Sequence, residues 1–180
     1  MRQPKHFPNY TLQDYELWEG DWELIEGIPY SMSPSANSQH QELSGILIWQ
    51  IRDWFRKHPN CNCKQRHDLD WRIDLNTVVR PDIAITCKEE SGNYITFPPV
   101  LIIEILSKAT AYNDRVVKLD LYQSKGVKYY IIADIQTKTY TVYQLSNGHY
   151  LEQQNGTTFQ LTTECSLHLD MDQAFQELEA

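Results

Sequence analysis

The chain has 180 residues, of which 41% are hydrophobic and 22% are charged, as in an ordinary folded protein. No apolar run reaches the roughly 18 residues of a membrane-spanning helix, and residues 1–20 lack the apolar stretch of a signal peptide. We therefore expect a single domain over residues 1–180, located in the cytoplasm and without a membrane partner.

The net charge of −8 argues against indiscriminate binding of nucleic acids, because phosphate contacts depend on Lys and Arg. The charge is nevertheless uneven along the chain. Residues 52–128 carry thirteen bases and ten acids, whereas residues 1–51 and 129–180 carry net charges of −5 and −6. The middle of the chain could present a basic surface, but a solvated surface of mixed charge fits the same numbers.

The N-terminal part predicts a short helix, a hairpin and a long helix. The segment "TLQDYELWEG" (11–20) is typical of a short helix that ends at Gly20. "WELIEGIPYSMS" (22–33) predicts a hairpin that turns at Glu26-Gly27, with Pro29 in an edge strand. A long helix is expected next over residues 38–58, where the following apolar residues recur at helical spacing: Leu43, Leu47, Ile51 and Trp54.

Two strands are expected in the middle of the chain. Residues 64–74 alternate as a half-exposed strand does, and residues 78–86 form a second strand. Pro81 cannot donate a backbone hydrogen bond, so it must lie at an edge, at a bulge or at the start of that strand. A connecting stretch then leads to a strongly apolar strand over residues 100–107.

The C-terminal half predicts a helix, a strand, a meander and a last helix. Residues 113–126 form a helix with Gly126 as its C-cap, and residues 127–134 form an apolar strand. The meander covers residues 139–161, and its turns fall at Asn147-Gly148 and Asn155-Gly156. Residues 171–180 form the closing helix. This order of elements predicts a mixed central sheet with helices packed against it.

The four cysteines do not suggest a disulfide framework in a chain of this length. Cys61 and Cys63 lie close to two histidines, but the spacing fits none of the usual zinc patterns. The other two cysteines are far away in the sequence. We therefore expect free thiols at Cys61, Cys63, Cys87 and Cys165.

The strand "VLIIEILS" (100–107) contains a residue that an apolar core does not tolerate by itself. Side chains alternate along a strand, so Ile102, Glu104 and Leu106 share one face. A bare carboxylate in an apolar interior costs several kcal/mol. Glu104 must therefore be neutralised, paired with a cation or bound to something.

A second acid, Asp82, lies just before the apolar run of the preceding strand, about twenty residues earlier. If the two strands are neighbours, Asp82 and Glu104 converge, and a divalent cation such as Mg²⁺ or Mn²⁺ between them would offset their repulsion. The backbone carbonyl of Ile105 is an additional candidate ligand. Two alternatives stay open: a protonated, unpaired Glu104, or separate ion pairs of the two acids with arginines, for which the candidates are Arg72, Arg80 and Arg115.

The helix that follows offers a lysine to the same place. Asp114, Lys118 and Tyr122 are spaced by four residues and therefore line one helical stripe. Lys118 could reach the carboxylates, where it would hold a water molecule or stabilise negative charge on a phosphate. The alternative is an ordinary surface salt bridge between Asp114 and Lys118.

Taken together, "VVRPDIAI", "PVLIIEILSKAT" and "NDRVVKLDLYQSKGVKYYIIAD" resemble the PD-(D/E)XK nuclease superfamily. The chain is most similar to the Uma-type "putative restriction endonuclease" family, and the likeness covers nearly its whole length. The resemblance implies an α/β fold of mixed α+β type, with a restriction-endonuclease-like core, a mixed central sheet flanked by helices, an N-terminal hairpin and a C-terminal meander. It also implies that Asp82 and Glu104 bind the metal and that DNA phosphodiester bonds are hydrolysed.

One departure from the superfamily motif concerns its lysine, which follows the second acid by two residues. This chain has Leu106 there, so we expect Lys118 to take over the role, with Lys108 as its rival. The resemblance further suggests that His40 and Glu23 lie near the site. Their alternatives are a histidine at a helix N-terminus that contacts solvent or the cap, and an edge-strand salt bridge.

The sequence therefore predicts an Mg²⁺- or Mn²⁺-dependent endonuclease with Asp82, Glu104 and Lys118 as its catalytic residues. A homodimer is plausible, because two sites related by a two-fold axis suit the two strands of a duplex. The competing hypothesis is a nuclease fold that binds nucleic acid or a protein partner without cutting. The net charge of −8 and the missing lysine at position 106 favour that alternative.

Overall fold

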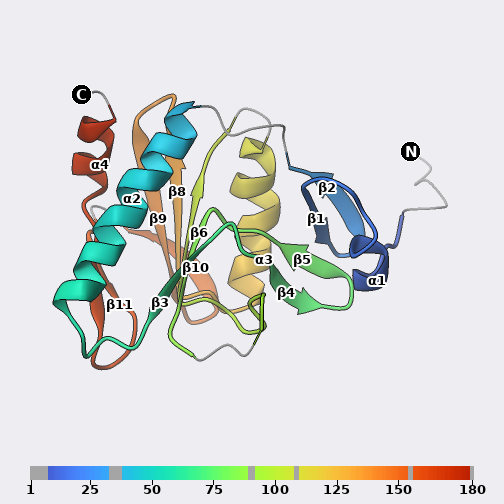
Figure 1. Ribbon diagram of the computed structural model, residues 1–180, viewed down its shortest axis with the longest axis horizontal. Helices are drawn as coiled ribbons and strands as arrows, with labels where there is room; N and C mark the ends of the chain where they lie inside the picture. The colour runs from blue at the N-terminus through green and yellow to red at the C-terminus, as the bar shows by residue number, and fades with distance from the viewer. Residues whose placement is uncertain (1–7, 33–37, 89–91, 108–109, 154–155, 179–180) are drawn as a thin grey trace.

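A mixed six-stranded sheet forms the centre of the computed structural model, which describes residues 8–32, 38–88, 92–107, 110–153 and 156–178 (Figure 1). In this sheet β7 and β8 run parallel to each other, and every other neighbouring pair is antiparallel. The predicted mixed central sheet is thus confirmed. In sheet order the strands are β10 (His149–Gln153), β9 (Thr139–Ser146), β8 (Tyr129–Asp134), β7 (Leu101–Ile105), β6 (Ile83–Thr86) and β3 (Lys64–His67).

Helices cover both faces of this sheet (Figure 1). Helices α2 (Ser38–Lys57) and α4 (Met171–Glu177) lie side by side on one face, and α3 (Lys118–Ser124) lies on the other. No helix in the described ranges is both long enough and apolar enough to cross a membrane. The residues of α2 that were expected to face the core do so: Leu43, Leu47 and Ile51 are fully buried and Trp54 packs against their cluster.

Strand β7 is buried along its whole length, and its side chains alternate between the two faces. Leu101, Ile103 and Ile105 belong to the apolar cluster under α2, whereas Ile102 belongs to the cluster under α3. Glu104 therefore faces α3, as the period of two predicted.

A smaller four-stranded sheet stands beside α3 and carries the N-terminal hairpin. The predicted turn is confirmed, because Glu26 and Gly27 have φ values of +52° and +78°, the left-handed pair that a two-residue hairpin turn needs. Pro29 lies in an edge strand, as expected. The predicted helix near the N-terminus is short and covers only α1 (Leu12–Tyr15). The sheet order is β2 (Ile28–Ser31), β1 (Trp22–Ile25), β5 (Thr77–Val79) and β4 (Trp71–Asp74).

The two strands predicted in the middle of the chain are wrong as single strands, because each is divided between the two sheets. Residues 64–74 break at Asp68, whose φ of +48° interrupts the extended backbone between β3 and β4. Residues 78–86 break at Pro81, which cannot donate a ladder hydrogen bond and separates β5 from β6. Asp82 consequently lies at the corner where the chain enters the central sheet.

The helix predicted over residues 113–126 is present, but its first turn is a π-helix, η1 (Asn113–Val117), that continues into α3. Wide turns of this kind occur often at functional sites. Gly126, with φ of +80°, ends the helix as predicted.

The predicted meander is confirmed only for β9 and β10, which pair with each other in antiparallel fashion and extend the central sheet beyond β8. Its turn at Asn147-Gly148 has φ values of +51° and +82°, whereas Asn155 of the second predicted turn lies outside the described residues. The last predicted strand of the meander, β11 (Thr158–Gln160), instead pairs with β12 (Ser166–His168) in a separate small sheet.

The prediction of free thiols is wrong. Disulfide bonds join Cys61 to Cys165 and Cys63 to Cys87. The second pair follows from the strand register, because Lys64 pairs with Thr86 and the two cysteines extend that ladder by one residue. Sequence spacing could not show this, since the pairing of β3 with β6 and the position of the β11–β12 hairpin are tertiary features.

Candidate active site

The strand register brings the two predicted acids together. Ile83 of β6 lies opposite Ile103 of β7 in an antiparallel ladder, so Asp82 lies beside Glu104. The backbone N–H of Asp82 donates to Glu104 Oε2 at 3.3 Å, and the N–H of Ile105 donates to Asp82 Oδ2 at 2.7 Å. The convergence expected from the sequence is therefore present in the structure.

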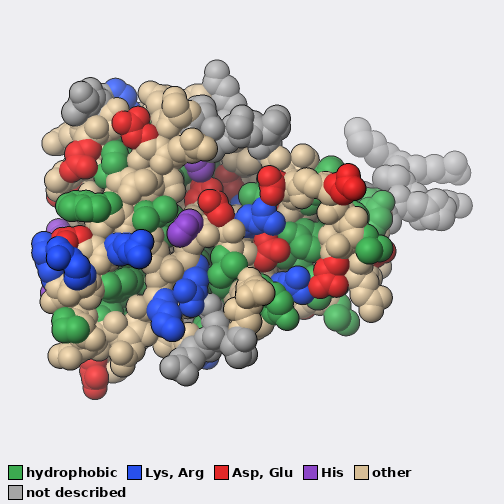
Figure 2. Space-filling model, in the orientation of Figure 1, with side chains coloured by type: hydrophobic (Ala, Val, Ile, Leu, Met, Phe, Trp, Pro, Cys, Tyr) green, Lys and Arg blue, Asp and Glu red, His purple; other side chains and the backbone are tan. Residues whose placement is uncertain are grey.

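Both acids line a cleft of about 380 Å³ between the central sheet, η1 and the smaller sheet. Acidic, basic and histidine side chains gather in the middle of this face (Figure 2), between α2 and the smaller sheet. Five of the other predicted residues line the same cleft, which is bounded by Asp21, Glu23, Ser31, Met32, His40, Asp68, Arg80, Asp82, Glu104, Ile105, Ser107, Thr110, Asn113, Asp114 and Lys118.

Lys118 is the cation at the centre of the cleft's inner wall. Its Nζ lies 3.0 Å from Glu104 Oε1, 2.9 Å from Glu23 Oε1 and 3.2 Å from Asp114 Oδ1. Lys118 and these three acids are each no more than 4% exposed. The alternative of an ordinary surface salt bridge is therefore wrong, because the Asp114–Lys118 pair is buried and shared with two more carboxylates.

Glu104 is not neutralised by an arginine. Arg80, Arg72 and Arg115 all bind other acids, so within the described residues none of these three candidates pairs with Asp82 or Glu104. Their partners are Asp70 (2.8 Å) and Asp21 (2.6 Å) for Arg80, Glu16 (2.7 Å) for Arg72 and Asp134 (2.8 Å) for Arg115. Nor is Glu104 unpaired, since it binds Lys118.

The charges in the cleft do not balance. Burial raises the pKa of Glu104 well above its usual value; Lys118 opposes this shift, while Asp114, Asp82 and Glu23 reinforce it. Burial likewise raises the pKa of Glu23 against the opposing effect of Lys118. A single ammonium thus faces more carboxylates than it can neutralise, and an additional cation would complete the site.

Oxygen atoms suited to such a cation are present. Asp82 and Glu104 offer carboxylates, the ligands that hard divalent cations prefer. Asp114 Oδ1 is buried and makes no hydrogen bond with any described residue, although it lies 3.2 Å from the Lys118 ammonium. A carboxylate oxygen has two lone pairs, so contact with the ammonium leaves it able to bind a further cation. The donor set therefore fits a divalent metal ion.

Tyr122 approaches Glu104 from the core side. Its buried hydroxyl donates to Glu104 Oε1 at 2.8 Å, on the same oxygen that Lys118 contacts. The stripe of Asp114, Lys118 and Tyr122 predicted from the spacing of four thus faces β7. The hydrogen bonds from Lys118 and Tyr122 fix the orientation of the Glu104 carboxylate.

Replacing Tyr122 by phenylalanine is expected to lower the free energy of unfolding by about 1–3 kcal/mol, because the buried Glu104 carboxylate loses a hydrogen bond. The phenylalanine ring keeps the shape of the tyrosine ring, so the packing around it is unchanged. Urea-induced unfolding of Tyr122→Phe and the parent protein measures this difference. Tyr112→Phe, at an exposed side chain just before η1, is the matched control and should leave the free energy unchanged. Equal stability of both variants would mean that Tyr122 does not hold Glu104.

His40 contacts Asp82 from the first turns of α2. Its Nε2 lies 3.2 Å from Asp82 Oδ2 and its side chain is only 15% exposed, so solvent is not its main partner. Burial alone would lower the pKa of His40, but the hydrogen bond and charge of Asp82, with smaller effects of the Ile105 backbone and Asp68, raise it above its usual value. His40 is thus favoured in its charged form and holds Asp82 in place.

This pKa shift makes the contribution of His40 to stability depend on pH. Because the folded-state pKa is raised, the stabilisation is fully present below the unfolded value of about 6.5 and is lost as the pH rises through the folded-state pKa. In metal-free protein, His40→Ala is therefore expected to cost about 1 kcal/mol near pH 5.5 and distinctly less near pH 9.5. Denaturant unfolding at both pH values measures this, and a cost that grows with pH would contradict the assignment.

Glu23 lies in β1, between β2 and β5, so the alternative of an edge-strand salt bridge is wrong. Its Oε1 accepts a hydrogen bond from the backbone N–H of Arg80 at 2.8 Å and lies 2.9 Å from Lys118. The smaller sheet thereby supplies an acid to the wall of the cleft.

The missing motif lysine is explained by packing. Leu106 is 6% exposed and belongs to the apolar cluster under α3, where a charged side chain would be buried. Lys118 reaches Glu104 from α3 instead, and its rival Lys108 lies outside the described residues. The ammonium expected beside the second acid is therefore present, but it comes from another element.

Several residues of the cleft were not predicted. Asp68 lies at the left-handed corner between β3 and β4; burial, and then the charge of Asp82, raise its pKa. Asp68 was missed because residues 64–74 were predicted as one continuous strand, without a corner at this position. Ser107 and Thr110 follow β7 at the rim of the cleft, and their hydroxyl oxygens lie 3.0 Å apart. The change from apolar to polar residues after the strand could have indicated their position in the site.

Comparison with known proteins agrees with this geometry. The crystal structure of a putative nuclease belonging to DUF820 from Anabaena variabilis ATCC 29413 matches with a TM-score of 0.74 and 19% identity, over 94% of this chain and 99% of that one. This likeness shows the fold. No curated protein matches the sequence. The profile of the Uma2 family, described as "Putative restriction endonuclease", matches residues 12–174, and the chain therefore belongs to that family.

Proposed function

We propose that the protein is a metal-dependent endonuclease that hydrolyses DNA phosphodiester bonds. The observation that carries this proposal is the excess of carboxylates around one buried ammonium, in a cleft that opens to solvent. Membership of the Uma2 family supports the nuclease assignment.

Asp82, Glu104 and the backbone carbonyl of Ile105 would hold Mg²⁺ or Mn²⁺, and Asp114 Oδ1 is a further oxygen close by. When bound, the ion would polarise the scissile phosphate and lower the pKa of the attacking water. The protein fixes the carboxylates in advance, because Ile105 N–H and His40 hold Asp82 while Tyr122 and Lys118 hold Glu104.

Lys118 has a second role in this proposal. Its pKa would fall on burial, but the charges of Glu104 and Glu23 outweigh that effect and raise it well above its usual value, so the amine stays protonated. A permanently charged Nζ can orient the attacking water or offset negative charge that develops on the phosphate. The amine cannot act as a general base while it holds its proton.

The face around the cleft suits a DNA backbone. Lys and Arg side chains gather over the C-terminal half of α2 and over β3, on the same side as the cleft (Figure 2). Phosphate contacts of this kind position a duplex without reading its sequence. The basic residues of the C-terminal half of α2 and of β3 are Arg52, Arg56, Lys57, Lys64 and Arg66.

We further infer one cytoplasmic domain over residues 1–180 that acts as a homodimer, since two such sites can cut both strands.

The direct test is a cleavage assay on plasmid DNA with and without Mg²⁺ or Mn²⁺. The parent protein is expected to nick or cut the DNA only with metal, and Asp82→Asn should be inactive. Asp120→Asn makes the same chemical change on an exposed residue of α3 and should keep full activity. Cleavage that persists in Asp82→Asn, or that needs no metal, would reject the proposal.

A second candidate is a nuclease fold that binds nucleic acid or a protein partner without cutting. It is favoured by the net charge of −8 and by the fact that Glu104 Oε1 already holds Lys118 and Tyr122. Metal titration separates the two candidates. Uptake of no divalent ion at millimolar concentration would favour the non-catalytic protein.

A further inference from the structure

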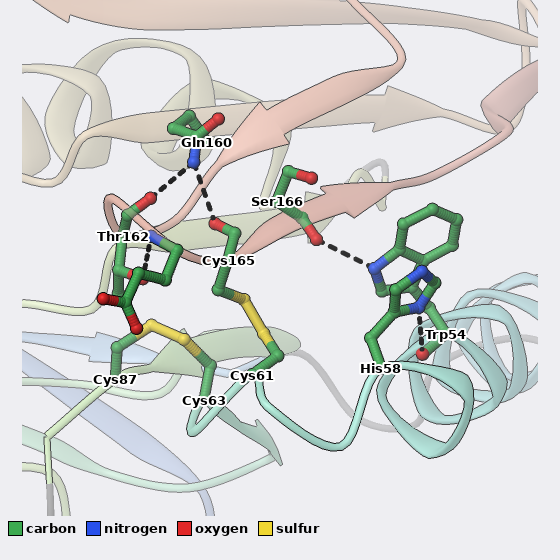
Figure 3. The surroundings of a disulfide bond; sticks show 10 residues. Trp54, His58, Cys61, Cys63, Cys87, Gln160, Thr162, Cys165 and Ser166 are labelled. Carbon is green, nitrogen blue, oxygen red and sulfur yellow. Dashed lines mark hydrogen bonds between the residues drawn. A yellow bond between two sulfur atoms is a disulfide. The ribbon is translucent and has the colours of Figure 1, made fainter.

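All four cysteines meet at one place, although they come from three distant parts of the sequence (Figure 3). Cys61 follows α2, Cys63 precedes β3, Cys87 follows β6, and Cys165 lies between β11 and β12. The Sγ atoms of Cys61, Cys63 and Cys165 all lie within 4.8 Å of one another, and Cys87 is joined to Cys63. The two disulfide bonds therefore form a single cluster of sulfur atoms.

We propose that the reduced protein binds one Zn²⁺ ion through the thiolates of Cys61, Cys63, Cys87 and Cys165. The two disulfide bonds are the oxidised, metal-free form of the same site. This site is independent of the proposed nuclease centre, since no cysteine is among the described residues that line the cleft.

The spacing of the sulfur atoms supports a shared ion. Zinc binds four thiolates in a tetrahedron with Zn–S distances of about 2.3 Å, which places the sulfurs about 3.8 Å apart. The Cys63 sulfur already lies within 4.8 Å of both sulfurs of the Cys61–Cys165 bond, and Cys87 is bonded to Cys63, so the fourth ligand is at hand once the bonds are reduced. Two disulfide bonds that merely fasten different parts of a fold do not have to bring their sulfurs together.

The chemistry balances with a thiol reductant. Each disulfide bond takes up two electrons and two protons, while two reductant thiols are oxidised to one disulfide. The four thiols formed then lose four protons as Zn²⁺ binds, because zinc coordinates the thiolate form. Exchange with a small-molecule disulfide, which takes up the four electrons and four protons as it is reduced to thiols, would release the ion and restore both bonds.

The surroundings indicate a structural rather than a catalytic ion. Cys63 and Cys165 are 7% and 3% exposed and belong to the apolar cluster under α2. Four cysteines complete the coordination of zinc and leave no open position for a substrate. The ion would fasten the β11–β12 hairpin, which pairs with no strand of the central sheet among the described residues, to the β3–β6 edge of that sheet.

The experiment measures zinc and thiols in protein purified with a reductant and without a chelator. We expect about one zinc ion per chain, and no reactive thiol until the ion is removed. Titration with Co²⁺ after zinc removal should give the thiolate-to-cobalt charge-transfer bands and the intense visible absorption of a tetrahedral site. This readout needs no variant and does not depend on nuclease activity.

Variants separate a shared ion from two independent pairs. Cys61→Ser and Cys87→Ser, which interrupt different disulfide bonds, are both expected to reduce bound zinc at least about tenfold, because one site needs all four ligands. His58→Ala is the control, since His58 lies beside the cluster but its Nδ1 contacts the carbonyl oxygen of Trp54 at 2.8 Å. It should keep the zinc, as should Asp82→Asn.

Three results would overturn the inference. In the first, folded protein with four titratable thiols binds neither zinc nor cobalt at the cysteines. In the second, both disulfide bonds persist in a strong reductant and the sulfurs never become available. Zinc that is lost from Asp82→Asn but retained in Cys87→Ser would equally overturn it, because the ion would then lie in the cleft.

Discussion

Replacing Glu104 by glutamine is expected to reduce metal-dependent DNA cleavage at least about a hundredfold, because the amide cannot supply the charge that holds a divalent cation. The same change should make the metal-free protein more stable near pH 8. Burial raises the pKa of Glu104, so its stabilising contribution is present below pH 4.5, the ordinary value, and is lost as the pH rises through the folded-state pKa. Glutamine avoids that loss.

Two measurements check this prediction together: plasmid cleavage in Mn²⁺, and thermal unfolding in a chelator at several pH values. The stability gain of Glu104→Gln over the parent should grow with pH. Glu152→Gln, on the exposed side of β10, is the matched control and should change neither quantity. A Glu104→Gln protein that cleaves as the parent does would remove Glu104 from the catalytic residues.

Replacing Lys118 by methionine is expected to destabilise the protein by about 3–5 kcal/mol near pH 8, because it leaves buried carboxylates without their cation. The penalty should shrink toward pH 5, since Glu23 and Glu104 have raised pKa values and lose their charge as the pH falls. Cleavage should fall by about 10²–10³-fold. Methionine matches the lysine side chain as far as Cε and lacks only the terminal amine, so packing is little changed.

The control for this variant is Lys125→Met, at the end of the same helix, where the lysine makes a partly exposed salt bridge with Asp74. Its effect on stability should stay below about 1 kcal/mol. If Lys118→Met is too unstable to purify, Lys118→Arg keeps the positive charge and should fold while losing much of the activity. Equal stability of Lys118→Met and Lys125→Met would contradict the buried ion cluster.

Local pattern was sufficient for the features that carry the site. The period of two along β7 placed Glu104 on the face of Ile102 and Leu106, which the structure packs under α3, and the spacing of four placed Lys118 on the stripe that meets it. These predictions depend only on the geometry of a strand and a helix. An acid inside an apolar strand is costly wherever it lies, so its partners had to be nearby.

What the sequence could not reveal depends on long-range pairing. The divided strands around Asp68 and Pro81 connect two sheets, and nothing local indicates that successive residues change sheets. The role of Glu23 depends on the same arrangement, because the smaller sheet carries it to Lys118. The cysteine pairs were missed for this reason too, since sequence separations of 104 and 24 residues carry no pairing information.

The most direct measurement of the central claim is anomalous diffraction from crystals soaked in millimolar Mn²⁺. The account predicts a strong Mn²⁺ peak within coordination distance of carboxylate oxygens of both Asp82 and Glu104. Lys118 should remain in contact with Glu104 on the inner side. A cleft without such a peak, in crystals where both carboxylates are ordered, would show that these acids do not share a divalent cation.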